Sequence, residues 1–303
     1  MAIDNDLLTR VLNRDERALA RAISLLESGG KGQALLQALR PQAGRARLIG
    51  ITGAPGSGKS TLTDRLIGVA RAAGERVAVL AVDPTSPFSG GAILGDRIRM
   101  MRWHQDRAVF IRSMATRGHL GGLAASTLQV ATLLDASGFD TIFIETVGVG
   151  QSEVEIAAAA DTTVVVLTPG QGDGVQAFKA GIMEVADIFA LNKYDQPGGP
   201  KLRREVQAAL ELAPATGWLP PLVPTVATAG TGIEELAAHI AEHRAYLAQD
   251  GLGQRRLSRA RLELATLLIG TLRQRLMARD DTWLEAAWLS ELAPEALIAK
   301  LLD

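Results

Sequence analysis

The sequence predicts an α/β fold in which a mostly parallel sheet is preceded and followed by helical segments. Apolar, β-branched runs alternate with helical patterns between residues 46 and 250, as expected when helices join parallel strands. A glycine loop joins the first run to a helix, and polar motifs directly follow several later runs. Because ligands of parallel sheets bind beyond the carboxyl ends of the strands, these motifs are expected at one edge of the sheet.

The composition agrees with this fold class and excludes several functions. The chain has 303 residues, of which 47% are hydrophobic and 4% aromatic, so it can bury a large core. A net charge of −1 gives no reason to expect nucleic acid or an anionic membrane as a partner. The absence of cysteine excludes disulfides and thiolate metal sites. With no membrane-length apolar run and an acidic start, the expected location is the cytoplasm.

Residues 1–45 are expected to form an N-terminal helical segment. Apolar side chains recur at helical spacing from residue 3 to residue 40, with a turn at 13–15 and a break at Gly29 and Gly30. Packing against the core is the simplest role for this segment.

Seven runs within residues 46–250 are the candidate strands. They are 48–52, 77–82, 108–112, 141–144, 163–167, 188–191 and 222–225. The expected helices include 122–136, 175–185, 200–212 and 233–247, and a further one starts near Lys59.

Residues 251–303 are expected to form a C-terminal helical extension. Six leucines recur along a basic helix, and a last helix is predicted at about 292–302. The six are Leu257, Leu264, Leu267, Leu268, Leu272 and Leu276. An isolated leucine-rich helix favours packing on a second subunit or a partner, with packing inside the chain as the alternative.

The glycine loop fits the phosphate-binding pattern G-x-x-x-x-G-K-[ST] and lies between a strand and a helix, as that pattern requires. Its residues are Gly53, Ala54, Pro55, Gly56, Ser57, Gly58, Lys59 and Ser60, followed by Thr61. Glycines let backbone N–H groups turn toward a phosphate, and the helix N-terminus adds partial positive charge. Lys59 is expected on the β- and γ-phosphates, and the Ser60 hydroxyl on Mg²⁺.

Three carboxylates are further candidates for the metal. Asp83 follows the second strand, Asp96 lies thirteen residues on, and Glu145 follows the fourth strand. Mg²⁺ prefers oxygen ligands and usually takes one or two carboxylates with phosphate and water. For the two aspartates, helix capping is the alternative. Lys59, Asp83 and Glu145 are therefore the candidate catalytic residues.

The segment from Glu145 to Gly148 has the form of the D-x-x-G switch of GTPases, with Glu for Asp. The N–H of Gly148 could bind the γ-phosphate, so this loop would order with GTP. Val149 follows where many GTPases place a water-positioning glutamine, and Gln151 is a possible substitute. Slow hydrolysis without a partner is expected.

Asn192, Lys193 and Asp195 match the motif N-K-x-D after the sixth strand. The Asp carboxylate can accept two hydrogen bonds from N1–H and N2–H₂ of guanine, which adenine cannot offer. After the seventh strand, backbone N–H groups at Ala227 or Thr228 are candidates for the base oxygen.

A glycine-rich loop at 168–174 leads into Gln176 and Lys179. So many glycines at a strand end favour a mobile element, with Asp173 and Lys179 able to re-pair on nucleotide binding. An ordinary surface loop is the alternative.

Together these motifs resemble the GTPases associated with methylmalonyl-CoA mutase, a family of the MeaB and ArgK type that is also known as LAO/AO transport system kinases. The resemblance covers about residues 3–280. It is carried by GAPGSGKST (53–61), VDPTSPFSGGAILGDRIRM (82–100), RSMATRGHLGGLA (112–124), ETVGVGQSE (145–153), PGQGDGVQAFKAGIMEVAD (169–187) and NKYD (192–195).

The resemblance implies a P-loop NTPase fold of the SIMIBI class and a dimeric GTPase that uses Mg²⁺. Such a protein gates the loading of adenosylcobalamin into a B12-dependent acyl-CoA mutase and protects that enzyme. It further implies that Asp83 and Asp96 serve the metal and a first switch, Glu145 a second switch, and Asp173, Gln176 and Lys179 a third.

Two other functions are compatible with the sequence. A nickel-delivering GTPase shares the fold class, but zero cysteines and only four histidines argue against it. A kinase acting on a transport protein is the other, although N-K-x-D selects GTP and no acceptor-binding base is evident.

Overall fold

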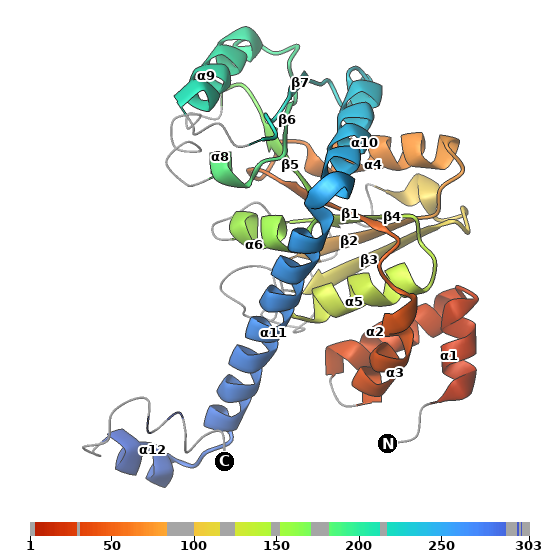
Figure 1. Cartoon of the computed structure of the whole chain (residues 1–303), viewed down its shortest axis with the longest axis vertical. Helices are drawn as coiled ribbons and strands as arrows, with labels where there is room; N and C mark the ends of the chain where they lie inside the picture. Colours follow the sequence, from red (N-terminus) through yellow and green to blue (C-terminus); the bar gives the residue numbers. More distant parts are fainter. Residues whose placement is uncertain are drawn as a thin grey trace.

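The computed structural model describes residues 4–28, 31–83, 100–115, 125–146, 152–170, 182–212 and 217–288, with the single residues 296 and 298. Within them a seven-stranded sheet has the order β3-β2-β4-β1-β5-β6-β7, and every adjacent pair is parallel (Figure 1). The strands are β1 (Arg47–Thr52), β2 (Val77–Asp83), β3 (Val109–Ala115), β4 (Thr141–Glu145), β5 (Thr162–Leu167), β6 (Ile188–Leu191) and β7 (Leu222–Pro224).

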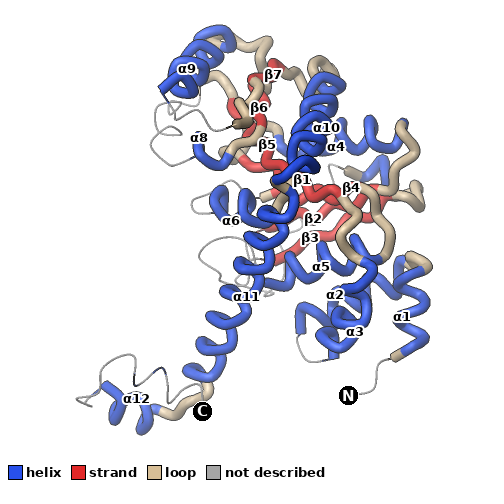
Figure 2. Tube along the Cα trace, in the orientation of Figure 1, coloured by secondary structure: helices blue, strands red, loops and turns tan. Residues whose placement is uncertain are grey.

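Helices precede, separate and follow these strands (Figure 2). They are α1 (Asn5–Leu12), α2 (Glu16–Ser28), α3 (Lys31–Leu39), α4 (Lys59–Ala72), α5 (Ala125–Ala136), α6 (Ser152–Ala159), α8 (Ile182–Val185), α9 (Gly199–Leu212), α10 (Ile233–Asp250), α11 (Leu252–Met277) and α12 (Asp281–Trp288).

The predicted α/β class with a parallel sheet is confirmed, and each of the seven predicted strands is present. Two helices, α6 and α12, were not predicted. The helix predicted at 175–185 falls largely outside the described residues, which include only its end as α8. Apart from two single residues, the helix predicted at 292–302 also lies outside them.

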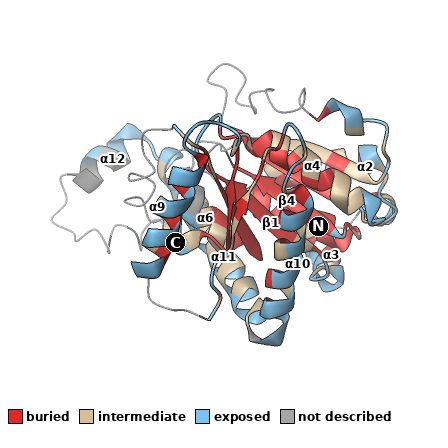
Figure 3. Cartoon of the chain, turned by 90° about the horizontal axis from the view of Figure 1, so that it is seen from above, coloured by how far each residue is buried: buried red, intermediate tan, exposed pale blue. Residues whose placement is uncertain are grey.

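The sheet is covered on both faces because successive side chains of a strand point to opposite sides. Ile49 and Ile51 of β1 pack with leucines of α4, whereas Leu48 packs with α5 and the N-terminal helices. Gly50 faces α6, and a Cβ atom there would lie 2.5 Å from Ile156 Cγ1. Figure 3 shows the resulting layer of buried strands between partly exposed helices.

The N-terminal helices form an outer layer on α5. Leu19, Ile23 and Leu36 are fully buried and belong to the same apolar cluster as Leu128 and Leu133 of α5. This segment therefore extends the core of the sheet, as its amphipathic pattern predicted.

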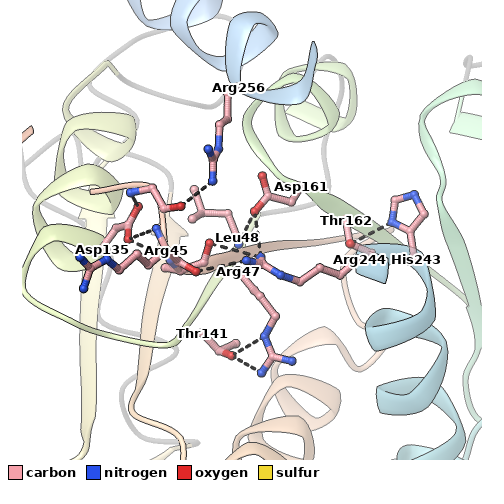
Figure 4. Close-up of polar contacts among 12 residues, drawn as sticks. Arg45, Arg47, Leu48, Asp135, Thr141, Asp161, Thr162, His243, Arg244 and Arg256 are labelled. Atoms are coloured by element: carbon pink, nitrogen blue, oxygen red, sulfur yellow. Dashed lines mark hydrogen bonds and ion pairs between the residues drawn. The ribbon is translucent and has the colours of Figure 1, made fainter. Parts of the chain in front are cut away.

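At the amino ends of the strands, buried carboxylates bind backbone N–H groups and arginines (Figure 4). Asp161 accepts from Leu48 N at 3.0 Å and from Arg259 Nη2 at 2.5 Å. Asp135 accepts from three successive N–H groups, of Gly44, Arg45 and Ala46. Each carboxylate is thus fully engaged, as buried charges must be.

Asp187 makes an equivalent junction between β5, α10 and α11. It accepts from Thr163 N at 2.8 Å and from Arg255 Nη2 at 2.5 Å. His243 Nε2 lies 3.4 Å from the same carboxylate. Burial lowers the pKa of His243 although Asp187 opposes the shift, so its ring is neutral at neutral pH. Arg255 therefore supplies the charge that balances Asp187.

The same arginines anchor α11 on α6. Arg255 donates to the carbonyl of Ala157 and Arg259 to that of Ala159, at the carboxyl end of α6. The carboxyl end of a helix favours cations because its last carbonyls have no hydrogen-bond partners within the helix.

Beyond this anchor, α11 extends away from the sheet toward α12 (Figure 1). Among its residues only Glu263 is buried, in an ion pair with Arg40. Five apolar side chains of α11 are exposed to 52–73%: Leu257, Leu264, Leu268, Ile269 and Met277. No helix in the described part of the chain is both long and apolar enough to cross a membrane.

Replacing Arg259 should destabilise the fold because Asp161 would lose its strongest cation while it stays buried. We expect Arg259→Met to lower the free energy of unfolding by about 2–3 kcal/mol in urea denaturation. Arg261→Met on the same helix is the control, since Arg261 is exposed and forms no hydrogen bond or ion pair with the described residues. Equal stability of the two variants would contradict a role for this anchor.

Candidate functional site

The loop between β1 and α4 adopts a conformation that requires glycine. Gly53, Gly56 and Gly58 have φ values of 138°, 76° and 93°, in the region that other residues avoid. A Cβ atom on Gly53 would overlap the carbonyl oxygen of Val166, and one on Gly58 would overlap Asn192 Nδ2. The loop is therefore held closely against β5 and against the segment after β6.

Lys59 begins α4 and folds over this loop. Its Nζ donates to the carbonyls of Gly53 at 2.8 Å and Ala54 at 3.1 Å, and the residue is only 7% exposed. Ser57 Oγ is buried without a hydrogen-bond partner among the described residues. The loop thus presents an ammonium group, a hydroxyl and a helix N-terminus at one place, a combination that fits a phosphate chain.

Glu145 lies next to the start of α4. Its carboxylate accepts from Ser60 Oγ at 2.6 Å and from Thr63 Oγ1 at 3.2 Å, and it is 3% exposed. The sheet register pairs Glu145 with Ile51 of β1 and Ala81 of β2. Asp83 is the last residue of β2, two residues after Ala81, and it is also buried. Asp83 and Glu145, on neighbouring parallel strands, and Ser60, at the start of α4, thus lie at the same edge of the sheet.

These oxygen atoms suit Mg²⁺, which prefers hard ligands and keeps several water molecules. Across the described ranges no group of three or more His, Asp or Glu side chains could hold a metal ion. One hydroxyl and a small number of carboxylates would be enough for Mg²⁺, because this ion takes its remaining oxygen ligands from phosphate and water. Asp96 and Gly148, the other residues predicted for the metal and the second switch, lie outside the described residues.

The N-K-x-D segment follows β6 and contacts the phosphate loop directly. Asn192 Nδ2 donates to the carbonyl of Ser57 at 2.8 Å, and Lys193 Nζ donates to that of Gly56 at 2.9 Å. Asn192 is buried, and Lys193 has a φ of 54°. Asp195 is exposed, so its carboxylate is accessible to a base.

The turn after β7 lies beside this segment. Asn192 Oδ1 accepts from Ala227 N at 3.1 Å and from Thr225 Oγ1 at 3.3 Å. The predicted base-contacting residues Ala227 and Thr228 are thereby placed next to the N-K-x-D motif. Sequence reasoning missed one residue here, Arg65 of α4, which donates to the carbonyls of both. Its targets are backbone atoms, so no side-chain pattern signals this contact.

The predicted third switch cannot be placed, because Asp173, Gln176 and Lys179 lie outside the described residues. The described residues before it are β5, which ends at Leu167, and then Thr168, Pro169 and Gly170, of which Thr168 is buried.

A family model for the methylmalonyl Co-A mutase-associated GTPase MeaB matches residues 19–281. A Pyrococcus horikoshii protein named as a GTPase is 48% identical over 280 residues, covering 90% of this chain and 88% of its own. The GTPase ArgK of Escherichia coli is 38% identical over 253 residues, with coverage of 80% and 76%. The mouse methylmalonic aciduria type A homolog, a mitochondrial protein, is 36% identical over 250 residues and is covered to 60%, against 76% of this chain.

Among solved structures, an LAO/AO transport system kinase matches with a TM-score of 0.74 and 28% identity, covering 98% of this chain and 95% of its own. Nickel-bound HypB of Helicobacter pylori matches with a TM-score of 0.52 and 16% identity, covering 71% and 94%. The second match shows a common fold only.

Gly58→Ala should weaken nucleotide binding more than Gly56→Ala. Both positions have positive φ, but a Cβ atom at Gly56 meets nothing within 4 Å, whereas one at Gly58 overlaps Asn192. Backbone strain of about 1–2 kcal/mol is common to both variants. We expect Gly58→Ala to bind GDP at least about tenfold more weakly than Gly56→Ala, since displacing Asn192 breaks a buried hydrogen bond. Calorimetry measures this, and equal losses would exclude the contact as the cause.

Proposed function

The chain belongs to the methylmalonyl-CoA mutase-associated GTPases, and we propose that it couples GTP hydrolysis to the service of a B12-dependent acyl-CoA mutase. In this role it gates the loading of adenosylcobalamin into the mutase and protects that enzyme. The observation that carries the proposal is the family match over residues 19–281, which includes every motif of the nucleotide site. The related mouse protein is named for methylmalonic aciduria, a name consistent with this client.

In the proposed complex the phosphates of GTP lie on residues 53–61, with Lys59 on the β- and γ-phosphates. Lys59 lies beside the loop, where its Nζ donates to two carbonyls, and phosphate oxygens would be alternative acceptors for it. Asp195 accepts from guanine, and the turn at Ala227 and Thr228 donates to the base oxygen.

Mg²⁺ would be held by Ser60, with Asp83, Asp96 and Glu145 around it, and would neutralise phosphate charge during hydrolysis. The Ser60 hydroxyl donates to Glu145 in the structure. The Ser60 oxygen can offer its lone pairs to a cation while its proton is donated to Glu145. Glu145 can therefore connect the metal site to the second switch, whose Gly148 follows three residues later.

We further propose a homodimer formed through the C-terminal extension. The support is α11, which is anchored at Arg255 and Arg259 but exposes apolar side chains beyond them, at Leu264, Leu268, Ile269 and Met277. A second copy of this helix would remove that apolar surface from water. The segment with Asp173, Gln176 and Lys179 is proposed to contact the mutase, and the protein to act in the cytoplasm.

Nickel delivery and kinase activity on a transport protein receive less support. The nickel-bound neighbour shares only the fold, and the present chain has no cysteine. For kinase activity, the support is the name of one structurally similar protein, an LAO/AO transport system kinase. No site for a phosphate acceptor is evident in the sequence of the present chain.

The test is GTP turnover with and without purified methylmalonyl-CoA mutase. Alone, the protein should hydrolyse on the order of one GTP per minute or less, because Val149 replaces a water-positioning glutamine. The mutase should accelerate this rate, and GTP should control the transfer of adenosylcobalamin into the mutase. Lys59→Ala is the control and should abolish turnover. A rate that the mutase leaves unchanged, with unchanged cobalamin transfer, would refute the client while leaving the GTPase intact.

A further inference from the structure

Arg65 connects the phosphate-binding helix to the turn after β7. It lies on α4, six residues after Lys59, and is half-buried. Its Nε donates to the carbonyl of Ala227 at 3.0 Å, and its Nη2 donates to that of Thr228 at 2.6 Å. A planar guanidinium offers its N–H donors at fixed angles to one another, so it sets the relative positions of two carbonyls more strictly than the rotating ammonium of lysine does.

The N–H groups of this turn are almost all engaged. Ala227 N donates to Asn192 Oδ1. Ala229 N donates to the carbonyl of Val226, and Gly230 N to that of Ala227. Of these consecutive N–H groups, that of Thr228 alone has no hydrogen bond to the described part of the chain.

The Ala227 carbonyl and the Thr228 N–H belong to the same peptide unit. That unit is planar and trans, so its carbonyl and its N–H point in opposite directions. A cation that fixes the carbonyl therefore fixes the direction of the N–H and also polarises it. Arg65 acts on this peptide from one side and leaves its donor open on the other.

We propose that Arg65 is a positioning residue for guanine, which fixes the Thr228 N–H as the donor to the base oxygen O6. The inference rests on the proposed placement of guanine beside Asp195 and this turn. Because Arg65 belongs to the helix that binds the phosphates, it ties base recognition to the same rigid element. A donor held in place before binding contributes more affinity than one that must be ordered by the ligand.

The test measures dissociation constants for GDP, 6-thio-GDP and IDP. In 6-thio-GDP sulfur, a weak acceptor, replaces O6, whereas IDP keeps O6 but lacks the 2-amino group that Asp195 would bind. The variants are Arg65→Met and Arg65→Lys. The matched control is Arg71→Met, because Arg71 lies on the same helix and binds Asp106 and the Glu75 carbonyl but not the turn.

We expect Arg65→Met to bind GDP about tenfold more weakly, as for the loss of a charged hydrogen bond, and Arg71→Met to bind GDP like the wild type. In the wild type, 6-thio-GDP should bind more weakly than GDP. The ratio of the 6-thio-GDP to the GDP dissociation constant should fall toward one in Arg65→Met. The reason is that the sulfur substitution and the loss of Arg65 remove the same interaction. Arg65→Lys should be intermediate. The IDP-to-GDP ratio should stay at the wild-type value in both Arg65 variants.

Three results would overturn the inference. If Arg65→Met and Arg71→Met weaken GDP equally, or if the 6-thio-GDP ratio is unchanged in Arg65→Met, Arg65 does not position the donor. If the wild type binds IDP as tightly as GDP, the placement of guanine beside Asp195 is itself wrong, and the role of Arg65 falls with it. The IDP measurement thus separates a failure of Arg65 from a failure of the site.

Discussion

The geometry of the nucleotide site depends on the hydrogen bonds made by the side chain of Asn192. Its Nδ2 holds the carbonyl of Ser57 in the phosphate loop, and its Oδ1 accepts from Ala227 in the turn after β7. The absence of a side chain at Gly58 makes room for this amide. One buried residue therefore joins the phosphate loop, the N-K-x-D segment and the turn after β7.

The two ends of the sheet have different tasks. At the carboxyl ends, polar groups such as Lys59 and Glu145 use acceptors and donors that a nucleotide and its metal could replace. At the amino ends, Asp135, Asp161 and Asp187 bind backbone N–H groups and arginines that fix the fold. The contacts that a proposed nucleotide would replace thus lie at the carboxyl ends, whereas those at the amino ends hold the N-terminal and C-terminal helices to the sheet.

The sequence was sufficient for the elements whose signal is local. The strands have continuous apolar runs because both of their faces are buried, and the phosphate loop and N-K-x-D segments have motifs of fixed spacing. Contacts between distant segments could not be predicted when one partner is a backbone atom. Arg65 and Arg255 look like ordinary helical arginines, yet each binds carbonyls far away in the sequence. The short helix α6 was missed because its eight residues, three of them alanine, form no clear apolar stripe.

The most direct test of the role of Asn192 uses a ligand that has no base. Affinities for GDP and for inorganic triphosphate with Mg²⁺ should be measured in the wild type, Asn192→Ala and Asp195→Asn. If Asn192 holds the phosphate loop in shape, Asn192→Ala should weaken both ligands, whereas Asp195→Asn should weaken GDP and leave triphosphate unchanged. Triphosphate binding by Asn192→Ala at the wild-type affinity would contradict the account, because the loop would then be independent of the base-recognising segment.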